Sequence, residues 1–263
     1  GEPVTCLDPA ATRRGGGVPP RLRTADGLTI TTMGNVGALG EQILIDERGL
    51  VVIPAEMPAS AAAILGCAVV TGLGAAFNVA RIRPGDTVAV IGCGGVGLNV
   101  IQGARIAGAS RIIAVDLSAE RAETARRFGA TDTVDSSVDV VEAVNSMTRG
   151  GVDHAFEVVG RPATVEQAMA MTAPGRNAYV VGVMADQATV EAGALWLRRG
   201  RSLVGVFMGS TRPRLDIPRY VEMYRRGQLD LDGMISRTMP LDDVNDGFRA
   251  LSAGEVARSV VTF

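Results

Sequence analysis

A short apolar run followed at once by closely spaced glycines, at residues 87–97, constrains the fold of this chain more than any other feature. The run Thr87–Ile91 is apolar on both faces, which is typical of a strand buried inside a parallel sheet. Gly92, Gly94 and Gly97 come next, and apolar residues then recur at the spacing of a helix face. The segment therefore predicts a strand, a tight glycine turn and a helix.

Each glycine of this turn has a mechanical reason to be there. Gly92 permits a sharp exit from the strand, Gly94 leaves backbone N–H groups open to a pyrophosphate, and Gly97 lets the helix pack closely on the sheet. The positive end of the helix dipole then favours the phosphates without the need for a lysine. Gly95 and Val96 belong to the same turn. The pattern is that of a dinucleotide-binding βαβ unit.

An acidic residue, Asp116, lies 19 residues beyond Gly97 and ends the next predicted strand, at residues 111–115. A carboxylate in that place accepts hydrogen bonds from both hydroxyls of the adenosine ribose, and it repels a 2′-phosphate. The expected cofactor is therefore NAD rather than NADP. The plainer interpretation is a structural glycine turn with a surface aspartate, and the flanking strand and helix disfavour it.

Strands and helices continue to alternate after this unit. The alternation predicts an α/β protein with a doubly wound parallel sheet, the Rossmann arrangement. The segments concerned are predicted strands at 152–159, 177–183 and 203–207, and predicted helices at 119–128 and from Pro162 onward. After Phe207 the alternation stops. Two amphipathic helices, closed by Gly227 and Gly254, precede a last predicted strand at 259–263.

The residues before the glycine turn have a different pattern. Residues 1–27 are punctuated by Pro and Gly and are expected to be loop. Residues 42–45 and 50–53 are expected to be strands divided by a turn. Residues 59–80 are uncharged and long enough to cross a bilayer. They contain few Leu, Ile or Phe, so buried helices joined by glycine are the expected structure.

Composition and charge narrow the class of protein. Apolar residues make up 47% and charged residues 21% of the 263 residues, which is ordinary for a globular enzyme. The net charge of −2 predicts neither a nucleic acid nor an anionic membrane as a partner. Three scattered cysteines predict no disulfide framework and favour a reduced, cytoplasmic setting.

Several segments, in order along nearly the whole chain, resemble the zinc-dependent medium-chain alcohol dehydrogenase family. They are Leu65–Gly72, the glycine turn with its helix, Arg111–Asp116, Gly150–Gly160 and Gly254–Phe263. The resemblance implies the remnant of a mostly-β GroES-like catalytic domain at 1–68, an NAD-binding Rossmann domain at 69–206 and a C-terminal return to the catalytic domain at 207–263. It also implies a fragment that lacks roughly the N-terminal third of a family member.

The resemblance gives Cys67 a metal-binding role, as the third protein ligand of a catalytic zinc. A thiolate suits an open three-ligand zinc site, whereas a lone cysteine in an Ala-rich helix is by itself more commonly a buried core residue. Cys6 resembles the last of four structural-zinc cysteines, and because such a site needs all four, a free thiol is expected. Cys93 needs no special role. His154, the only histidine, is expected to be packed in an apolar strand rather than catalytic.

Matched residue by residue, the resemblance implies further cofactor contacts. Arg121 is expected near the adenosine ribose and Arg258 near the pyrophosphate, where a planar guanidinium fork suits phosphate oxygens. The residues expected to flank the adenine are Val158, Val159 and Arg161, and those expected to line the nicotinamide are Thr71, Val96, Val181, Val183 and the backbone around Phe207. Each of these valines also fits a core strand.

For the complete protein the resemblance implies zinc-assisted hydride transfer between an alcohol or aldehyde and NAD. The family's earlier Cys and His ligands and its hydroxyl residue are missing here, so we expect the fragment to bind NAD weakly or not at all and to turn over nothing. The alternatives are an S-(hydroxymethyl)thiol (formaldehyde) dehydrogenase of the same superfamily and a non-catalytic NAD-binding protein without its zinc domain. A homodimer or homotetramer through the region 195–207 is the expected assembly.

Overall fold

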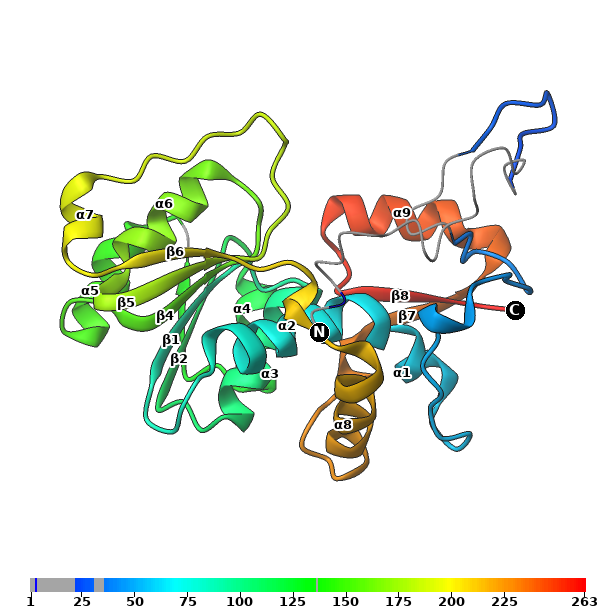
Figure 1. The fold of residues 1–263 in the computed structure, drawn as a ribbon, viewed down its shortest axis with the longest axis horizontal. Helices are drawn as coiled ribbons and strands as arrows, with labels where there is room; N and C mark the ends of the chain where they lie inside the picture. Colours follow the sequence, from blue (N-terminus) through cyan, green and yellow to red (C-terminus); the bar gives the residue numbers. More distant parts are fainter. Residues whose placement is uncertain (1–2, 4–21, 31–35, 136) are drawn as a thin grey trace.

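The computed structural model describes residues 3, 22–30, 36–135 and 137–263. The described residues form two lobes that lie side by side (Figure 1). The larger lobe is built on a six-stranded parallel sheet flanked by helices, and the smaller lobe contains a two-stranded sheet. This is the mixed α/β fold with a doubly wound parallel sheet that the sequence predicts.

The six strands of the large sheet lie in the order β3-β2-β1-β4-β5-β6. Their bounds are β1 Thr87–Ile91, β2 Arg111–Asp116, β3 Asp132–Asp135, β4 Val152–Glu157, β5 Thr172–Val180 and β6 Ser202–Gly205. Every neighbouring pair is parallel. The order reverses between β1 and β4. In such sheets, ligands bind at the carboxyl ends of the strands beside that switch point.

Helices cover both faces of this sheet. They are α3 Gly95–Ile106, α4 Ala119–Phe128, α5 Val140–Thr148, α6 Pro162–Ala170 and the short α7 Ala194–Arg198. Capping explains the limits of α4. The Ser118 side chain accepts a hydrogen bond from the N–H of Arg121, and Gly129 ends the helix with a φ of 119°. The sequence predicts the same limits for this helix.

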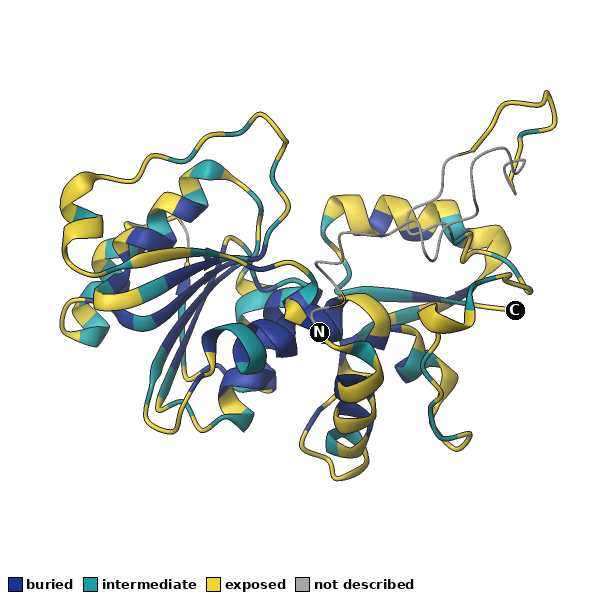
Figure 2. Ribbon diagram, in the orientation of Figure 1, coloured by how far each residue is buried: buried dark blue, intermediate teal, exposed yellow. Residues whose placement is uncertain are grey.

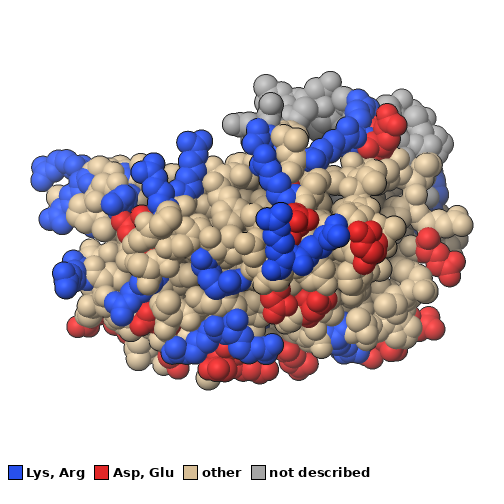
Figure 3. Space-filling model, turned by 90° about the horizontal axis from the view of Figure 1, so that it is seen from below, with Lys and Arg blue, Asp and Glu red and all other residues tan. Residues whose placement is uncertain are grey.

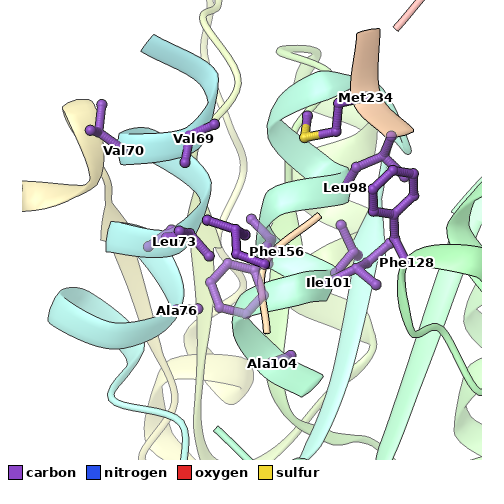
Figure 4. Packing of buried hydrophobic residues seen from close by; sticks show 14 of the residues in the cluster. Val69, Val70, Leu73, Ala76, Leu98, Ile101, Ala104, Phe128, Phe156 and Met234 are labelled. Atoms are coloured by element: carbon purple, nitrogen blue, oxygen red, sulfur yellow. The ribbon is translucent and has the colours of Figure 1, made fainter. Parts of the chain in front are cut away.

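Residues 59–80 form an almost continuous helical path between the two lobes (Figure 1). It consists of α1 Ala59–Ala63, a π-helical turn Leu65–Val69, α2 Val70–Gly74 and a second π-helical turn Ala75–Ala80. Small residues let it lie close to α3, since a Cβ on Gly103 would come 2.7 Å from the Cβ of Ala76. Figure 4 shows Leu73 of this path beside Phe156 of β4.

Among the described residues, no helix has the length and hydropathy needed to span a bilayer.

C-terminal residues complete the smaller lobe. Its elements are α8 Pro213–Arg225, β7 Ile235–Pro240, α9 Val244–Ala253 and β8 Arg258–Thr262, with 3₁₀ turns at Met208–Ser210, Asp232–Met234 and Leu241–Asp243. β7 and β8 form a parallel pair, and much of the surface of α9 is exposed (Figure 2). Gly254 ends α9 in the left-handed region, as the sequence predicts. The domain limits at residues 68 and 206 stay predictions.

The predicted strands at residues 42–45 and 50–53 are wrong. Both segments lack regular secondary structure, and a 3₁₀ turn, Glu47–Gly49, lies between them. The side chain of Val52 is 92% exposed. A strand needs a neighbour for its backbone hydrogen bonds, and neither segment joins a sheet in the described part of the chain.

Strand limits also differ from the prediction at the carboxyl edge of the sheet. β4 ends at Glu157 rather than at residue 159, and β5 ends at Val180 rather than at residue 183. A Cβ on Gly182 would overlap the backbone nitrogen of Gly160. This close backbone approach lies just beyond β4 and β5, where both segments of the chain leave the sheet. The sequence pattern does not reveal β3, which has four residues, or α5.

Two clusters of buried apolar side chains hold the helices on the sheet. Phe156 of β4 is fully buried, and its ring stacks on that of Tyr179 in β5 with the centroids 4.8 Å apart. The helical path 59–80, α3 and Phe128 of α4 belong to the same cluster as Phe156 (Figure 4). α5 and α6 contribute to the other cluster. Phe156 therefore belongs to one of the two interfaces between sheet and helices.

Removal of the Phe156 ring is expected to destabilise the fold. We expect Phe156→Ala to lower the free energy of unfolding by about 3–5 kcal/mol, because it leaves a cavity between the sheet and its covering helices. Val52→Ala, at an exposed side chain, is the control and should change it by less than about 0.5 kcal/mol. Chemical denaturation followed by circular dichroism measures both. A loss below about 1 kcal/mol for Phe156→Ala would contradict this packing.

Candidate functional site

The glycine turn joins β1 to α3 at the switch point of the sheet. Gly92 has a φ of 96°, and its N–H donates to the carbonyl oxygen of Val115 in β2 at 2.8 Å. A Cβ on Gly97 would overlap the carbonyl oxygen of Gly92. Gly94 faces open space, because no atom lies within 4 Å of the place where its Cβ would be. The turn is therefore tight at its two ends and open at its centre.

The guanidinium group of Arg258 lies directly against Gly95, the first residue of α3. A Cβ on Gly95 would overlap this group, so a side chain at position 95 would displace the guanidinium from this place. Burial lowers the pKa of Arg258. Among the described residues, no carboxylate lies within ion-pair distance of the guanidinium. A half-buried cation at the positive end of a helix dipole, without a counter-ion, suits an anion such as a pyrophosphate.

Asp116 ends β2 and turns its carboxylate toward the glycine turn. Oδ2 accepts a hydrogen bond from the N–H of Cys93 at 2.8 Å, and Oδ1 accepts one from the N–H of Ser118 at 3.1 Å. The guanidinium of Arg121 lies 3.8 Å from Oδ1 and donates to the carbonyl oxygen of Gly254 at 2.8 Å. Backbone donors thus orient the carboxylate and leave lone pairs for further donors.

Burial, with a smaller effect of Asp116, raises the pKa of Cys93 to about 12, so its thiol stays protonated.

Two hollows lie beside the start of α4. One, of about 380 Å³, is lined by Gly94, Arg121 and residues 254–257. The other, of about 280 Å³, is lined by Asp116 and by residues of α4. Ser118 lines both hollows. The hollows therefore lie next to each other, one beside the open centre of the glycine turn and the other beside the carboxylate at the end of β2. The adenosine half of a dinucleotide would lie along this side of the turn.

The segments after β4 and β5 form the opposite side of the crevice. Val158 donates its N–H to the last residue of β1 at 2.9 Å, and the side chain of Val159 lies against the first glycine of the turn. Arg161 is the exposed N-cap residue of α6. Val181 is buried beyond the end of β5, whereas Val183 is 93% exposed. All of these predicted adenine and nicotinamide residues lie at the carboxyl edge of the sheet.

The remaining predicted nicotinamide residues lie on α2, at the start of α3 and after β6. A Cβ on Gly72 would come 2.5 Å from the carbonyl oxygen of Val96, so the helix that carries Thr71 packs on the first turn of α3. The segment that begins at Phe207 packs on the same helix, since a Cβ on Gly209 would come 2.8 Å from the carbonyl oxygen of Thr71. Phe207 itself is 65% exposed. The structure brings these distant segments together, and their contacts with a cofactor stay predictions.

The exposed thiol of Cys67 lies on the π-helical turn Leu65–Val69 and lines a cavity of about 560 Å³. α9, β7 and β8 supply most of the other walls, and Arg258 lies on one side. Catalytic zinc takes three protein ligands and keeps one open position. In the part of the chain that the structure describes, no group of three His, Cys, Asp or Glu side chains lies together, so these residues do not hold zinc by themselves. Cys6 lies outside the described residues.

His154 lies away from the crevice, near the amino end of β4. Its ring nitrogens contact the hydroxyl of Tyr179 at 3.2 Å and the carboxylate of Asp86 at 3.0 Å, which leaves neither nitrogen for a substrate. Burial opposes ionisation of Asp86, but hydrogen bonds from the N–H of Arg83 and from His154 outweigh it and lower the pKa of Asp86. His154 is a packed residue, as the sequence leads us to expect.

Sequence reasoning missed one buried residue at the carboxyl edge of the sheet. Glu157, the last residue of β4, is fully buried. Its Oε1 accepts hydrogen bonds from the N–H groups of Val159 and Gly160 and from the hydroxyl of Thr164. A carboxylate directly after the apolar pair Ala155 and Phe156, at the end of a buried strand, is the signal that points to such a residue, because a buried carboxylate needs hydrogen-bond donors.

Comparison with known proteins identifies the family. A family model described as zinc-binding dehydrogenase matches residues 95–226, half of the chain. The chain belongs to the zinc-binding dehydrogenase family. The resemblance to medium-chain alcohol dehydrogenases, drawn from the sequence, is thereby confirmed.

Two curated relatives of this zinc-binding dehydrogenase match most of its length. Alcohol dehydrogenase-like 5 of Arabidopsis thaliana is 37% identical over 250 residues, which are 93% of this chain and 64% of the relative. A protein named S-(hydroxymethyl)glutathione dehydrogenase 1 in Schizosaccharomyces pombe is 37% identical over 227 residues, which are 85% of this chain and 60% of the relative. The chain therefore spans less than two thirds of the length of these relatives.

Solved structures of the family share the fold. A zinc-binding dehydrogenase of Sinorhizobium meliloti bound to NADP matches with a TM-score of 0.72 and 30% identity, over 85% of this chain and 63% of that one. The six-stranded parallel sheet is thus the Rossmann domain of zinc-binding dehydrogenases. The NADP in that relative agrees with a nicotinamide cofactor for the family.

Acidification is expected to weaken the contact between Asp86 and His154. Because the pKa of Asp86 in the folded chain lies below its ordinary value of 3.8, the carboxylate stabilises the fold above that value. This stabilisation is lost as the pH falls through the folded pKa. We expect Asp86→Asn to be less stable than the wild type at about pH 7 and the difference to shrink between about pH 5 and about pH 2. Urea unfolding at several pH values measures this, and a difference independent of pH would contradict it.

Proposed function

We propose that the protein carrying these residues is an oxidoreductase that transfers a hydride between an alcohol or aldehyde and NAD. The observation that most supports this is the guanidinium of Arg258 against Gly95, without a carboxylate partner among the described residues. This cation and the positive end of α3 converge beside the open centre of the glycine turn, where a diphosphate fits. The bound cofactor would supply the hydride chemistry, and this chain would hold and orient it.

Asp116 favours NAD over NADP in this proposal. Its carboxylate offers acceptors to the ribose hydroxyls and a like charge to a 2′-phosphate. Arg121 is the cation that a 2′-phosphate would use, but its guanidinium already lies near Asp116 and donates to the carbonyl oxygen of Gly254. These contacts support NAD rather than NADP as the cofactor in this proposal.

We further propose that zinc takes part in the activity of the whole protein, with Cys67 as one ligand. Membership of the family and the exposed thiol beside an apolar cavity support this. Because the described residues do not group three ligands, these 263 residues alone are expected to turn over no alcohol. The glycine turn, Asp116 and Arg258 all lie within the chain, so weak binding of NAD is expected.

The relative named S-(hydroxymethyl)glutathione dehydrogenase supports a second candidate function. In that case the substrate would be the adduct of formaldehyde with a thiol. A third candidate is a non-catalytic NAD-binding protein. Assays of the whole gene product separate the three: NADH forms with simple alcohols, or with formaldehyde and glutathione, or with neither.

A homodimer or homotetramer paired through β6 is the proposed assembly, in a cytoplasmic setting. β6 is the edge strand of the large sheet, and its unpaired backbone groups are open to a second copy. Side chains of both charges are interspersed on the face seen in Figure 3. This mixture gives no support to a nucleic acid or membrane partner, so the proposed partners are a small alcohol or aldehyde and further copies of the chain.

Replacement of Asp116 tests the choice of NAD. We expect Asp116→Ser to raise the dissociation constant of NAD about 10-fold or more, because hydrogen bonds from the ribose hydroxyls to a charged acceptor are lost. NADP binding should weaken less. Asp139→Ser is the control, since Asp139 caps α5 and serine replaces aspartate well as a cap. Calorimetric titration measures the constants, and an unchanged value for Asp116→Ser would overturn the assignment of NAD.

Zinc dependence is tested on the whole gene product. We expect NADH formation from an alcohol to require zinc and to fall about 100-fold or more in Cys67→Ser, because the hydroxyl does not replace a thiolate ligand. Absorbance at the NADH band measures the rate, and a zinc-specific assay measures the bound metal. Full activity in Cys67→Ser, or turnover by these 263 residues alone, would contradict the proposed role of Cys67.

A further inference from the structure

Glu157 lies at the switch point of the sheet, beside the glycine turn. It is the last residue of β4, and in the register of the two strands it pairs with Ile91, the last residue of β1. Its side chain is fully buried. The hydride-transfer proposal gives this carboxylate no role, and no described cation pairs with it.

The side chain of Glu157 ties down the turn between β4 and α6. Oε1 accepts hydrogen bonds from the N–H of Val159 at 2.8 Å, the N–H of Gly160 at 2.6 Å and the hydroxyl of Thr164 at 2.7 Å. Val159 in turn lies against the glycine turn, because a Cβ on Gly92 would come 2.8 Å from its side chain. One carboxylate oxygen therefore fixes the position of Val159 beside the crevice.

The same residue also holds the end of β5. The backbone carbonyl oxygen of Glu157 accepts hydrogen bonds from the N–H groups of Val181 at 2.8 Å and Gly182 at 3.1 Å. A Cβ on Gly182 would come 2.7 Å from Oε2. Beyond it, Val183 packs its backbone on Gly160, where a Cβ would overlap the Val183 carbonyl oxygen. The side chain of Glu157 thus holds the segment after β4, and its backbone carbonyl oxygen holds the segment after β5.

The second carboxylate oxygen is a poor contributor to stability. Oε2 is buried and has no hydrogen-bond partner in the described structure. A buried charged group with an unsatisfied oxygen costs free energy, and an apolar residue of similar size is often as stable in such a place. Local departures of this kind from an optimised core concentrate at functional sites.

We propose that Glu157 is a positioning residue of the cofactor site. Its side chain holds the backbone of residues 159–160 and its carbonyl oxygen holds that of residues 181–182, without touching the cofactor itself. These residues belong to the two segments expected to flank the adenine and the nicotinamide. This inference rests on the proposed function for the identity of the ligand, whereas the contacts that fix the two segments are independent of it. Glu157 acts by keeping the crevice in the shape that the bound dinucleotide needs, so that less ordering is required on binding.

The test compares variants of the full 263-residue chain. Glu157→Leu removes the acceptor and keeps a similar volume, and Glu157→Gln keeps an acceptor oxygen. Thr164→Val removes one of the three donors and leaves Glu157 in place. Asp216→Asn is the matched control, because Asp216 is a carboxylate of α8 that is 2% exposed and accepts the N–H of Arg212 at 2.8 Å.

Two quantities are measured: the NADH dissociation constant and, without cofactor, the hydrogen exchange of the Val159 and Gly160 amides. We expect Glu157→Leu to raise the dissociation constant about 10-fold or more, Glu157→Gln to stay within about 3-fold of the wild type, and Thr164→Val to raise it by about 3-fold. Exchange of both amides should accelerate in Glu157→Leu and Thr164→Val. Asp216→Asn should change neither quantity.

Wild-type NADH affinity in Glu157→Leu overturns the inference, as does an equal loss of affinity in Asp216→Asn. If Glu157→Leu does not fold, Thr164→Val is the deciding variant. Hydrogen exchange of the Val159 and Gly160 amides at the wild-type rate in Thr164→Val would then overturn the inference. A wild-type chain that binds no NADH counts against the proposed cofactor. In that case the exchange of Val159 and Gly160 still decides whether Glu157 fixes these segments.

Discussion

The close approach of the first turn of α3 to the end of β1 is the contact on which the rest of the site depends. Gly97 lies so near the carbonyl oxygen of Gly92 that a side chain would overlap it, and a side chain on Gly95 would overlap the guanidinium of Arg258. These two contacts aim the amino end of α3 at the crevice and add a second positive charge beside it. A side chain at position 97 would push the first turn of α3 away from the end of β1, and one at position 95 would displace the guanidinium of Arg258.

Small residues on the helical path 59–80 extend this close packing to the other lobe. Gly72 brings the helix that carries Thr71 against the start of α3, and the segment after Phe207 packs on the same helix. Segments far apart in the sequence therefore meet at one edge of the sheet. Positive groups lie near the centre of the glycine turn and a carboxylate lies at its outer end, which is the charge pattern that a diphosphate joined to a ribose requires.

Local patterns in the sequence predict the local parts of this structure. The glycine turn, the position of Asp116 and the limits of α4 follow from short-range steric and capping rules, and the structure has them as predicted. Residues 42–53 have the composition of strands, but strand formation depends on a partner, and neither segment joins a described sheet. The contacts of Glu157 depend on the register between β1 and β4 and on glycines beyond both strands, so they become visible only in three dimensions.

The most direct measurement is a titration of the isotopically labelled chain with millimolar NAD, followed through backbone amide chemical shifts. If the dinucleotide binds at the amino end of α3, the largest changes occur at residues 92–97 and at Asp116 and Arg258, which contact the turn at Cys93 and Gly95. The absence of changes at residues 92–97, or changes confined to the cavity beside Cys67, would contradict the assignment of this crevice as the cofactor site.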